Sequence, residues 1–283
     1  MGSAVQPVAA AGGNQVPWRL DPAPRSPGIG RCTRKRNLSD TQSYYEQNAE
    51  QFFADTIAVD MSALYARFLD SIPAGGSILD AGCGSGRDAK AFAARGYRVA
   101  AFDASPALAA LASQYLGQPV PVRSFAEVGE FSRYDGIWAC ASLLHVPQLQ
   151  IPDAFARLWQ ALKPGGVFYC SFKIGAGERE HQGRRFTDAD QAQMDAWLAP
   201  LAEVADVSYW HTADQRPGRS DAWLNVLARR QRCRRRAWSP AASWTTSCRT
   251  CAARSTRPAK STWRWPLSRA PDCACCCLTC WRG

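Results

Sequence analysis

Residues 78–88 read Ile78-Leu79-Asp80-Ala81-Gly82-Cys83-Gly84-Ser85-Gly86-Arg87-Asp88, an apolar run that becomes a glycine-rich loop and then the start of a helix. Glycines let the backbone pass close beneath a ligand, and the start of a helix presents free N–H groups to it. A dinucleotide-binding fold uses the spacing G-x-G-x-x-G, whereas here the glycines stand at every second position. The segment also lacks the Gly-Lys-Ser/Thr of a P-loop. The spacing therefore disfavours a nicotinamide-dependent oxidoreductase and a P-loop nucleotidase.

Two acidic residues accompany this loop. Asp80 precedes the first glycine, where a carboxylate would repel a pyrophosphate but would suit the ammonium group of an amino acid. Asp103 ends the next expected strand, a place where an acidic side chain can accept hydrogen bonds from both hydroxyls of a ribose. These two residues indicate a ligand that carries an ammonium group and a ribose.

Strands and helices alternate on both sides of this segment. Ser105 and Pro106 predict the start of one helix, and Gly117 predicts its end. Strands that alternate with helices of this length form βαβ units, so we expect an α/β fold with a mainly parallel sheet covered on both faces. We expect strands at 77–81, 97–102, 120–125, 135–141, 167–172, 204–210 and 223–228, and helices near 44–53 and at 60–69, 88–95, 106–116, 152–162 and 188–198.

Charge divides the chain into three parts. Residues 1–39 hold 6 Lys and Arg against 1 Asp, and they are rich in Ala, Gly and Pro without a hydrophobic period. Residues 40–230 hold 17 Lys and Arg against 22 Asp and Glu, and residues 231–283 hold 11 against 1. We therefore expect a disordered leader at 1–39 and a single folded domain at 40–230.

Residues 231–283 form a low-complexity tail rich in Arg, Cys and Trp that contains no Val, Ile, Phe or Tyr. This composition is typical of a GC-rich gene read out of frame, so we expect a frameshift product or an unfolded extension. The pairs Cys248-x-x-Cys251 and Cys277-x-x-Cys280 imitate the spacing of a zinc site, but further cysteines crowd the second pair. We expect no metal.

The composition of the middle part also bears on partners and location. An enzyme that acts on nucleic acid carries its basic charge on the folded body. Residues 40–230 are acidic, so the composition disfavours a nucleic-acid partner. No run approaches the roughly 20 apolar residues of a membrane helix, so we expect no membrane partner. Cys83, Cys140 and Cys170 are scattered, as free thiols in a reducing compartment are, so we expect a cytoplasmic protein. The oligomeric state is left open.

Four segments in order resemble the class I S-adenosylmethionine-dependent methyltransferases. They are LDAGCGSG at 79–86, VAAFDAS at 99–105, YDGIWAC at 134–140 and LKPGG at 162–166. The resemblance covers residues 40–230. It implies a methyltransferase (EC 2.1.1.-) with a Rossmann-like domain and a seven-stranded sheet, in which the last two strands form a hairpin.

The resemblance implies a site for S-adenosyl-L-methionine. In this family the third strand often ends in an acidic residue beside the adenine, and Ser124-Phe125-Ala126-Glu127 departs from that pattern. The methionine part would lie against Asp80, Gly82, Cys83, Gly84 and Gly86, and the sulfonium above Cys140 and Ala141. The ribose and adenine would lie against Asp103, Ala104, Ser105, Phe125 and Ala126, with Tyr45 on a helix that closes over the cofactor.

The acceptor side of the site rests on two further features. His145 follows the fourth strand and is either a histidine bonded to the backbone or a catalytic base and substrate contact. A sulfonium methyl is already electrophilic, so a base is optional. Residues 175–185 are expected to form a charged loop, either a mobile lid on which Arg185 recognises an anionic substrate or a solvated loop.

The motifs narrow the acceptor only by exclusion. The (Asp/Asn/Ser)-Pro-Pro-aromatic motif of amino-modifying DNA methyltransferases and the Pro-Cys of cytosine enzymes are both absent after the fourth strand. We therefore expect a small-molecule acceptor. The alternatives are a non-catalytic module that binds S-adenosylmethionine and the methyltransferase part of a longer multidomain protein.

Overall fold

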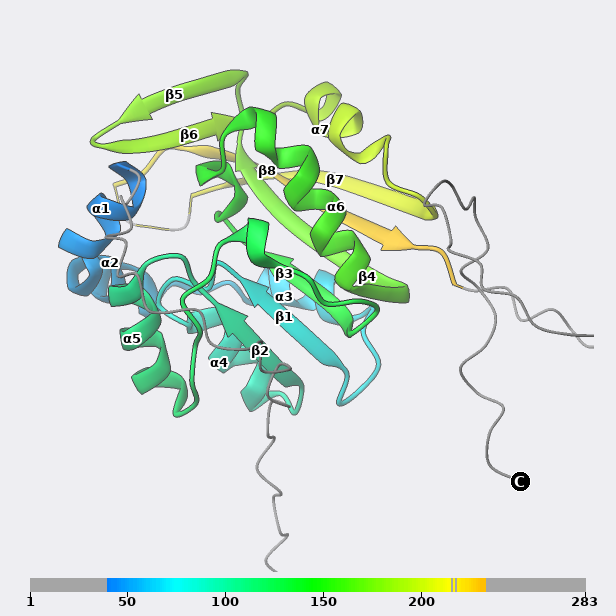
Figure 1. Ribbon diagram of the computed structural model, residues 1–283, viewed down its shortest axis with the longest axis horizontal. Coiled ribbons are helices and arrows are strands. Elements are labelled where there is room, and N and C mark those ends of the chain that lie inside the picture. Colours follow the sequence, from blue (N-terminus) through cyan, green and yellow to red (C-terminus); the bar gives the residue numbers. More distant parts are fainter. Residues whose placement is uncertain (1–39, 215, 217, 233–283) are drawn as a thin grey trace, which may run out of the picture. The chain divides into compact units, whose positions relative to one another are not determined.

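The computed structural model describes residues 40–214, 216 and 218–232 (Figure 1). The leader expected at 1–39 and the expected tail beyond Arg232 lie outside these residues. Within the described part of the chain, no helix is long and apolar enough to cross a membrane.

A six-stranded sheet forms the centre of the fold, in the order β2-β1-β3-β4-β8-β7. The first four strands of that order are parallel, and β7 and β8 form an antiparallel hairpin that pairs with β4 through β8. The α/β class and the final hairpin are confirmed. The bounds are β1 (Ser77–Ala81), β2 (Arg98–Phe102), β3 (Tyr134–Ala139), β4 (Leu162–Lys173), β7 (Val204–Ala213) and β8 (Ala222–Arg230).

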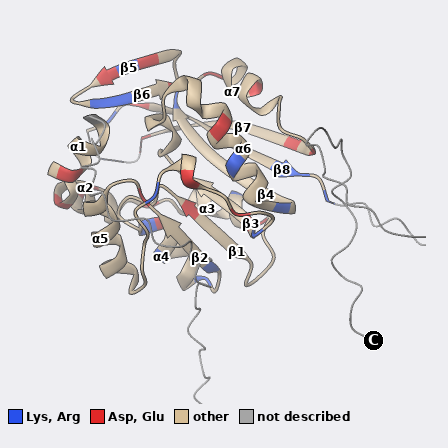
Figure 2. Ribbon diagram, in the orientation of Figure 1, with Lys and Arg blue, Asp and Glu red and all other residues tan. Residues whose placement is uncertain are grey.

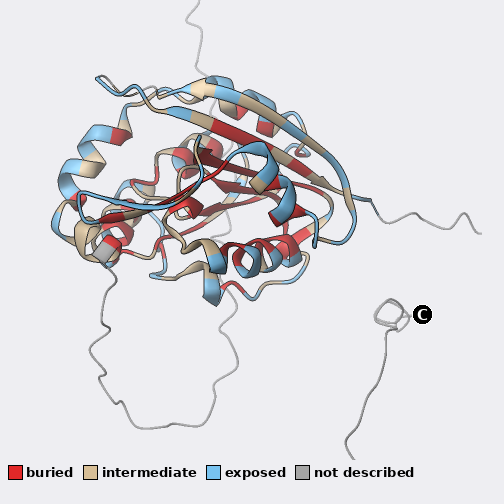
Figure 3. Ribbon diagram, turned by 90° about the horizontal axis from the view of Figure 1, so that it is seen from above, coloured by how far each residue is buried: buried red, intermediate tan, exposed pale blue. Residues whose placement is uncertain are grey.

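Helices cover both faces of the sheet. On one face α3 and α4 pack on Ile78, Trp138 and Tyr169, and on the other α6 and α7 pack on Phe168 and Phe172. Since both faces are covered, the central strands are buried almost continuously, as Figure 3 shows. The helices are α1 (Asp40–Gln47), α2 (Ala49–Ile57), α3 (Ser62–Leu69), α4 (Arg87–Ala94), α5 (Pro106–Leu116), α6 (Ile151–Ala161) and α7 (Gln191–Leu198), with short 3-10 turns η1 (Phe125–Glu127), η2 (Leu143–His145) and η3 (Gln148–Gln150).

Capping residues explain where several helices begin and end. The Ser105 hydroxyl accepts from the Leu108 amide at 3.2 Å, Pro106 is the first helical residue, and Gly117 ends α5 in the left-handed conformation. The single helix expected near 44–53 is instead divided into α1 and α2. The Asn48 side-chain amide donates to the Tyr44 carbonyl at 2.8 Å at this break.

The strand expected at 120–125 is not formed. Val122 makes one isolated bridge with Asp103, so the described sheet has six strands and not the seven that the family resemblance implied. Pro119 precedes this stretch and Pro121 lies within it, and neither has an N–H to donate to a ladder. At Ser124 the chain turns into η1.

The charged loop expected at 175–185 is instead largely a two-stranded hairpin of β5 (Gly177–His181) and β6 (Arg184–Asp188). Gln182 and Gly183 connect the strands with φ values of 52° and 71°, as a tight hairpin turn requires. Figure 2 shows Lys and Arg gathered on β6 and acidic residues on β5. The sequence lacked the apolar alternation of a strand here because β5 is exposed.

Candidate functional site

The glycine-rich loop lies between β1 and α4, where the carboxyl ends of the parallel strands meet. Gly82 and Gly84 have φ values of 76° and 54°, which favour glycine. A Cβ on Gly82 would lie 2.6 Å from the Cβ of Ser142, and one on Gly84 would lie 3.0 Å from the Phe52 ring. The loop therefore forms a close-fitting cradle with no room for side chains at these two positions.

Asp103 fixes this loop to the end of β2. Its carboxylate accepts from the Gly84 amide at 2.8 Å and from the Ser105 amide at 2.9 Å. Burial raises the pKa of Asp103, although these amides favour the charged form. Glu46 of α1 lies next to it, accepting from the Ser105 hydroxyl at 2.6 Å. The Ala104 amide adds a third hydrogen bond, and the carboxylate still has acceptor capacity for a further donor such as a ribose hydroxyl.

Two further carboxylates lie beneath the loop. Asp80 is buried and accepts from the Ala89 amide in the first turn of α4 at 3.0 Å, so it connects β1 to that helix. Burial raises its pKa, and the charge of Asp88 adds to the effect. Asp88 accepts from Arg87 and from Tyr65, both at 2.6 Å. Burial opposes its charge, but the Arg87 guanidinium holds the pKa of Asp88 below its usual range.

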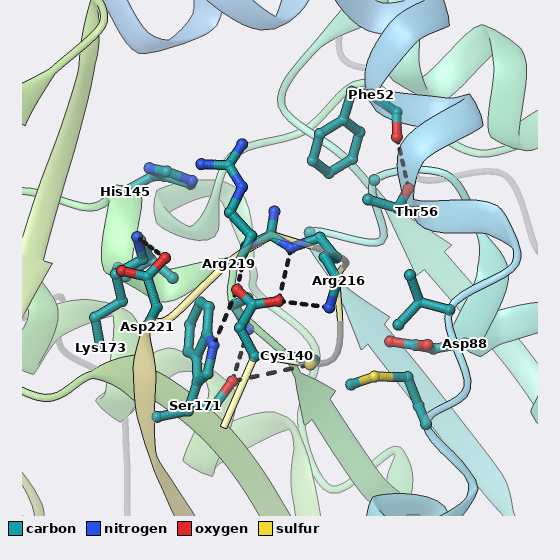
Figure 4. Close-up of a pocket in the computed structure, with 18 of the residues that line it drawn as sticks. Phe52, Thr56, Asp88, Cys140, His145, Ser171, Lys173, Arg216, Arg219 and Asp221 are labelled. Carbon is teal, nitrogen blue, oxygen red and sulfur yellow. Dashed lines mark hydrogen bonds and ion pairs between the residues drawn. The ribbon is translucent and has the colours of Figure 1, made fainter. Parts of the chain in front are cut away.

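A cavity of about 440 Å³ opens beside the loop, a size typical of small-molecule sites (Figure 4). Elements from both ends of the described chain surround it: α1 and α2, the ends of β3 and β4, the β5–β6 hairpin, and the segment that joins β7 to β8. In Figure 4, Arg216 and Arg219 lie between His145 and Lys173 on one side and Phe52, Thr56 and Asp88 on the other.

The structure divides the expected cofactor residues into two groups. One group lines the cavity: Tyr45, Gly82, Cys83, Gly84, Cys140 and Ala141. The other group adjoins the loop without lining the cavity: Asp80, Gly86, Asp103, Ala104, Ser105, Phe125 and Ala126. Gly86 caps α4 against Ala112 and Leu116, and Phe125 packs edge-on against Phe102.

Ala141 and Cys140 form the floor of the cavity at the end of β3. Ala141 has φ of 50°, a left-handed conformation that strains a residue with a side chain and is enriched at functional sites. Its amide donates to the Ser171 hydroxyl of β4 at 2.9 Å. Burial raises the pKa of the Cys140 thiol to about 12, so this group stays protonated at neutral pH.

His145 lines the cavity with both ring nitrogens engaged. The Arg185 carbonyl, 2.8 Å from Nδ1, can only accept, so Nδ1 donates and Nε2 accepts from the Tyr45 hydroxyl at 2.8 Å. Burial lowers the pKa of His145 to about 4 and raises that of Tyr45 to about 12. The pair therefore holds a neutral imidazole and a protonated phenol at neutral pH.

The side chain of Arg185 is directed away from the cavity and pairs with Glu178 on the outside of the hairpin at 3.2 Å. Its neighbour Arg184 lines the cavity instead, because successive residues of a strand face opposite sides. Sequence reasoning missed Arg184 because it treated this segment as a loop. The turn pair Gln182-Gly183 was the signal that could have revealed the hairpin and its alternation.

Other cavity residues that sequence reasoning missed come from the end of β4, from the hairpin and from the β7–β8 segment. They include Lys173, Arg179, Arg216, Arg219, Asp221 and Trp223. Among the residues that the structure describes, His, Cys, Asp and Glu form no group of three that could hold a metal ion.

Comparison with known proteins adds a family and several relatives. A family model described as a methyltransferase domain matches residues 53–211. The malonyl-[acyl-carrier protein] O-methyltransferase of Serratia marcescens is 32% identical over 149 residues, which are 48% of this chain and 54% of the relative. The chain thus spans about half the length of this curated relative.

Solved structures share the fold. The 1,6-didemethyltoxoflavin-N1-methyltransferase of Burkholderia thailandensis, solved with 1,6-didemethyltoxoflavin and S-adenosylhomocysteine, has a TM-score of 0.56 at 23% identity, covering 74% of this chain and 94% of that one. The magnesium protoporphyrin IX methyltransferase of Synechocystis, solved with S-adenosylmethionine, has a TM-score of 0.51 at 17% identity, covering 70% and 100%.

Proposed function

The chain belongs to the class I S-adenosylmethionine-dependent methyltransferase family, and from this membership we propose that it transfers a methyl group from S-adenosyl-L-methionine to a small-molecule acceptor. One observation carries the proposal: the Gly82–Gly84 cradle, fixed by the Asp103 carboxylate, borders a cavity of about 440 Å³. This arrangement provides a ribose acceptor and a close backbone approach next to space for a second molecule.

The residues present fit this cofactor. Asp103 has free acceptor capacity for the ribose hydroxyls, and the cradle has no side chains that would keep the methionine part away. The Phe125 ring lies next to Gly82, and we propose that it and the Ala126 amide border the adenine. Tyr45, Cys140 and Ala141 line the cavity on the acceptor side, and they would border the reacting methyl group.

In such a reaction the protein aligns the acceptor atom with the methyl group and keeps water out of the site. When bound, the cofactor supplies an electrophilic methyl group on sulfur, so an acceptor that is already nucleophilic needs no proton removed. The cavity fits that case, since Cys140 and Tyr45 both stay protonated at neutral pH. Phe52, Met61 and Leu64 give it an apolar wall that limits access of water.

The role of His145 as a catalytic base stays a prediction. Its Nε2 lone pair is engaged by the Tyr45 hydroxyl, so proton abstraction would first require that Tyr45 move away. We propose that His145 instead positions Tyr45 against the acceptor, while the Arg185 carbonyl fixes the tautomer of the imidazole.

We place the activity in the cytoplasm. The three described cysteines, Cys83, Cys140 and Cys170, are free thiols, which suits a reducing compartment. The relatives are named for acceptors as different as malonyl-[acyl-carrier protein], 1,6-didemethyltoxoflavin and magnesium protoporphyrin IX. Family membership therefore does not identify the acceptor, and the inference has to come from the residues that line the cavity.

Calorimetric titration of the full chain with S-adenosylmethionine, and separately with NAD, tests the cofactor. We expect saturable binding of the first alone. Asp103→Asn should weaken it by about 10- to 100-fold, because a hydrogen bond to a charged group contributes about 1.5–3 kcal/mol. Asp206→Asn, at an exposed position of β7, is the matched control and should bind as the unaltered chain does.

Transfer of a labelled methyl group to the small molecules of a cell extract tests catalysis. Label in an extract component supports the enzyme. Cofactor binding without any transfer would instead support the alternative, a non-catalytic module or one part of a longer protein. Absence of S-adenosylmethionine binding would overturn both.

A further inference from the structure

Besides Arg87, which pairs with Asp88, five cationic side chains from three separate segments line the cavity. Lys173 comes from the end of β4, Arg179 and Arg184 from the β5–β6 hairpin, and Arg216 and Arg219 from the segment that joins β7 to β8. Figure 4 shows Lys173, Arg216 and Arg219 around the cavity. We call these five residues the cation cluster.

Carboxylates neutralise three members of the cation cluster. Arg216 is held by both oxygens of Asp214, with the closer contact at 2.5 Å. Such pairs leave little charge for a ligand, since each cation already has a full counter-charge. The other two pairs are Lys173 with Asp221 at 2.8 Å and Arg179 with Asp188 at 2.5 Å.

Arg184 is buried, and no carboxylate of the described residues forms an ion pair with it. Its side chain is on the cavity wall, the residue is 9% exposed, and its Nε is buried with no hydrogen-bond partner in the described part of the chain. Its polar neighbours are the Gln182 amide oxygen at 3.2 Å and the Tyr45 phenol, both neutral at pH 7. A buried guanidinium strongly favours a bound anion in such surroundings.

Aromatic rings orient this guanidinium. It lies over the Tyr44 ring at 4.3 Å and over the Phe186 ring at 5.3 Å. Stacking of this kind holds the planar group in place and leaves its edge for a bidentate partner.

Arg219 is the second member without a counter-charge. It is exposed, and among the residues described no carboxylate forms an ion pair with it, while its amide donates to the Arg216 carbonyl in the turn. After the three ion pairs, the cation cluster therefore carries two unbalanced positive charges, one buried and one exposed.

We propose that the methyl acceptor is a small organic anion, and that Arg184 binds its oxyanion group with Arg219 adding a second positive charge. The proposal rests on the proposed function and names the acceptor class of the same site. The shared chemistry is that of a carboxylate or a phosphate, since a guanidinium matches both through two parallel hydrogen bonds. Phe52, Leu64 and Trp223 give the cavity an apolar surface for the organic part.

Titration of the full chain with simple anions tests the proposal directly. The chain is saturated with S-adenosylhomocysteine and titrated with acetate, with inorganic phosphate, and with acetamide as the neutral analogue of acetate. Intrinsic tryptophan fluorescence reports on the cavity through Trp223. We expect at least one anion to bind saturably and acetamide not to bind, and the preferred anion distinguishes a carboxylate from a phosphate acceptor.

Three variants locate the site. Arg184→Gln should lower the anion affinity at least 10-fold and leave S-adenosylhomocysteine affinity within about twofold. Arg184→Lys, which keeps the charge but loses the planar group, should be intermediate. Arg98→Gln removes an exposed guanidinium of β2 outside the cavity and is the matched control. Added anion should raise the melting temperature of the unaltered chain more than that of Arg184→Gln.

The outcomes separate this proposal from the proposed function. If S-adenosylhomocysteine binds but acetate and phosphate bind no better than acetamide, the anion site is wrong and the cofactor assignment stands. If Arg184→Gln weakens S-adenosylhomocysteine binding 10-fold, Arg184 serves the carboxylate of the cofactor, and the acceptor proposal is overturned. If Arg185→Gln removes anion binding and Arg184→Gln does not, the site lies on the outer face of the hairpin.

Discussion

At the level of single side chains, the Tyr45–His145 pair sets the protonation states beside the cavity. Burial disfavours the imidazolium, and the Tyr45 hydroxyl donates to the nitrogen that a proton would have to take. A histidine of this kind stays neutral across the physiological range. Its pKa in the folded protein, about 4, lies below the value of about 6.5 expected in the unfolded chain.

This difference predicts a pH dependence of stability. Between pH 6.5 and 4 the unfolded chain binds a proton at His145 that the folded protein does not, so the free energy of unfolding falls as the pH falls through this window. Above pH 6.5 neither state binds this proton, so His145 no longer lowers the free energy of unfolding. Urea unfolding of the full chain at pH 7.5, 6 and 5 should show the fall, and His145→Gln should make it shallower. His211→Gln, at an exposed position, should keep the original slope.

The difference between Arg184 and Arg185 shows what sequence reasoning about single residues can and cannot reach. Gly82, Gly84 and Asp103 were predicted to come together because each follows the carboxyl end of a parallel strand, a place that the βαβ pattern determines. No local sequence pattern of this kind predicts the position of Arg184. It lines the cavity only because the hairpin of β5 and β6 sets which of two adjacent arginines faces inward.

Among the helices and strands, the sequence predicted those that have strong local signals. The strands β1 to β3 and the capped helix α5 have apolar runs or caps of their own, and they were found close to their observed bounds, whereas β4 begins at Leu162, well before the expected start at 167. The exposed strand β5 has no apolar face, and the expected strand at 120–125 is interrupted by prolines. Pairing in these places depends on neighbours that are distant in sequence, so a local pattern could not predict it.

One glycine shows how closely a helix approaches the sheet. A Cβ on Gly136 of β3 would lie 2.3 Å from Ile72 and 2.7 Å from the Phe68 ring of α3. Gly136→Ala should therefore push the Ile72 and Phe68 side chains aside and lower the free energy of unfolding by about 1–3 kcal/mol. Urea unfolding measures the loss. Gly129→Ala is the control, since a Cβ there meets nothing within 4 Å; an equal loss in both variants would contradict the close approach.

For the domain as a unit, α1 and α2 pack over the glycine-rich loop and the start of α5. Glu46 of α1 covers the start of α5, where Ser105 is 2% exposed and Asp103 8% exposed. On α2, the Thr56 hydroxyl donates to the Phe52 carbonyl and accepts from the Ser85 hydroxyl at 3.0 Å, and the Arg87 side chain donates to the Thr56 carbonyl. If Asp103 binds a ribose, as we propose, α1 has to move away from it first.

This closure predicts an effect on binding rates. Glu46→Ala removes the contacts between α1 and the start of α5, so it should speed association of S-adenosylhomocysteine several-fold. Stopped-flow fluorescence measures the rate. Glu50→Ala, at an exposed position of α2, should leave it unchanged. An association rate that Glu46→Ala does not alter would show that α1 does not limit access.

The strand order has a consequence for synthesis. β8 is the last strand that the structure describes, yet it is placed between β4 and β7 and pairs with both. Until the ribosome has released β8, the edge of β4 stays open and β7 has no neighbour, and open edges of this kind recruit strands from other chains. A nascent chain that stops before Ala222 therefore carries an aggregation-prone strand edge. We expect chaperones to bind such a truncated chain.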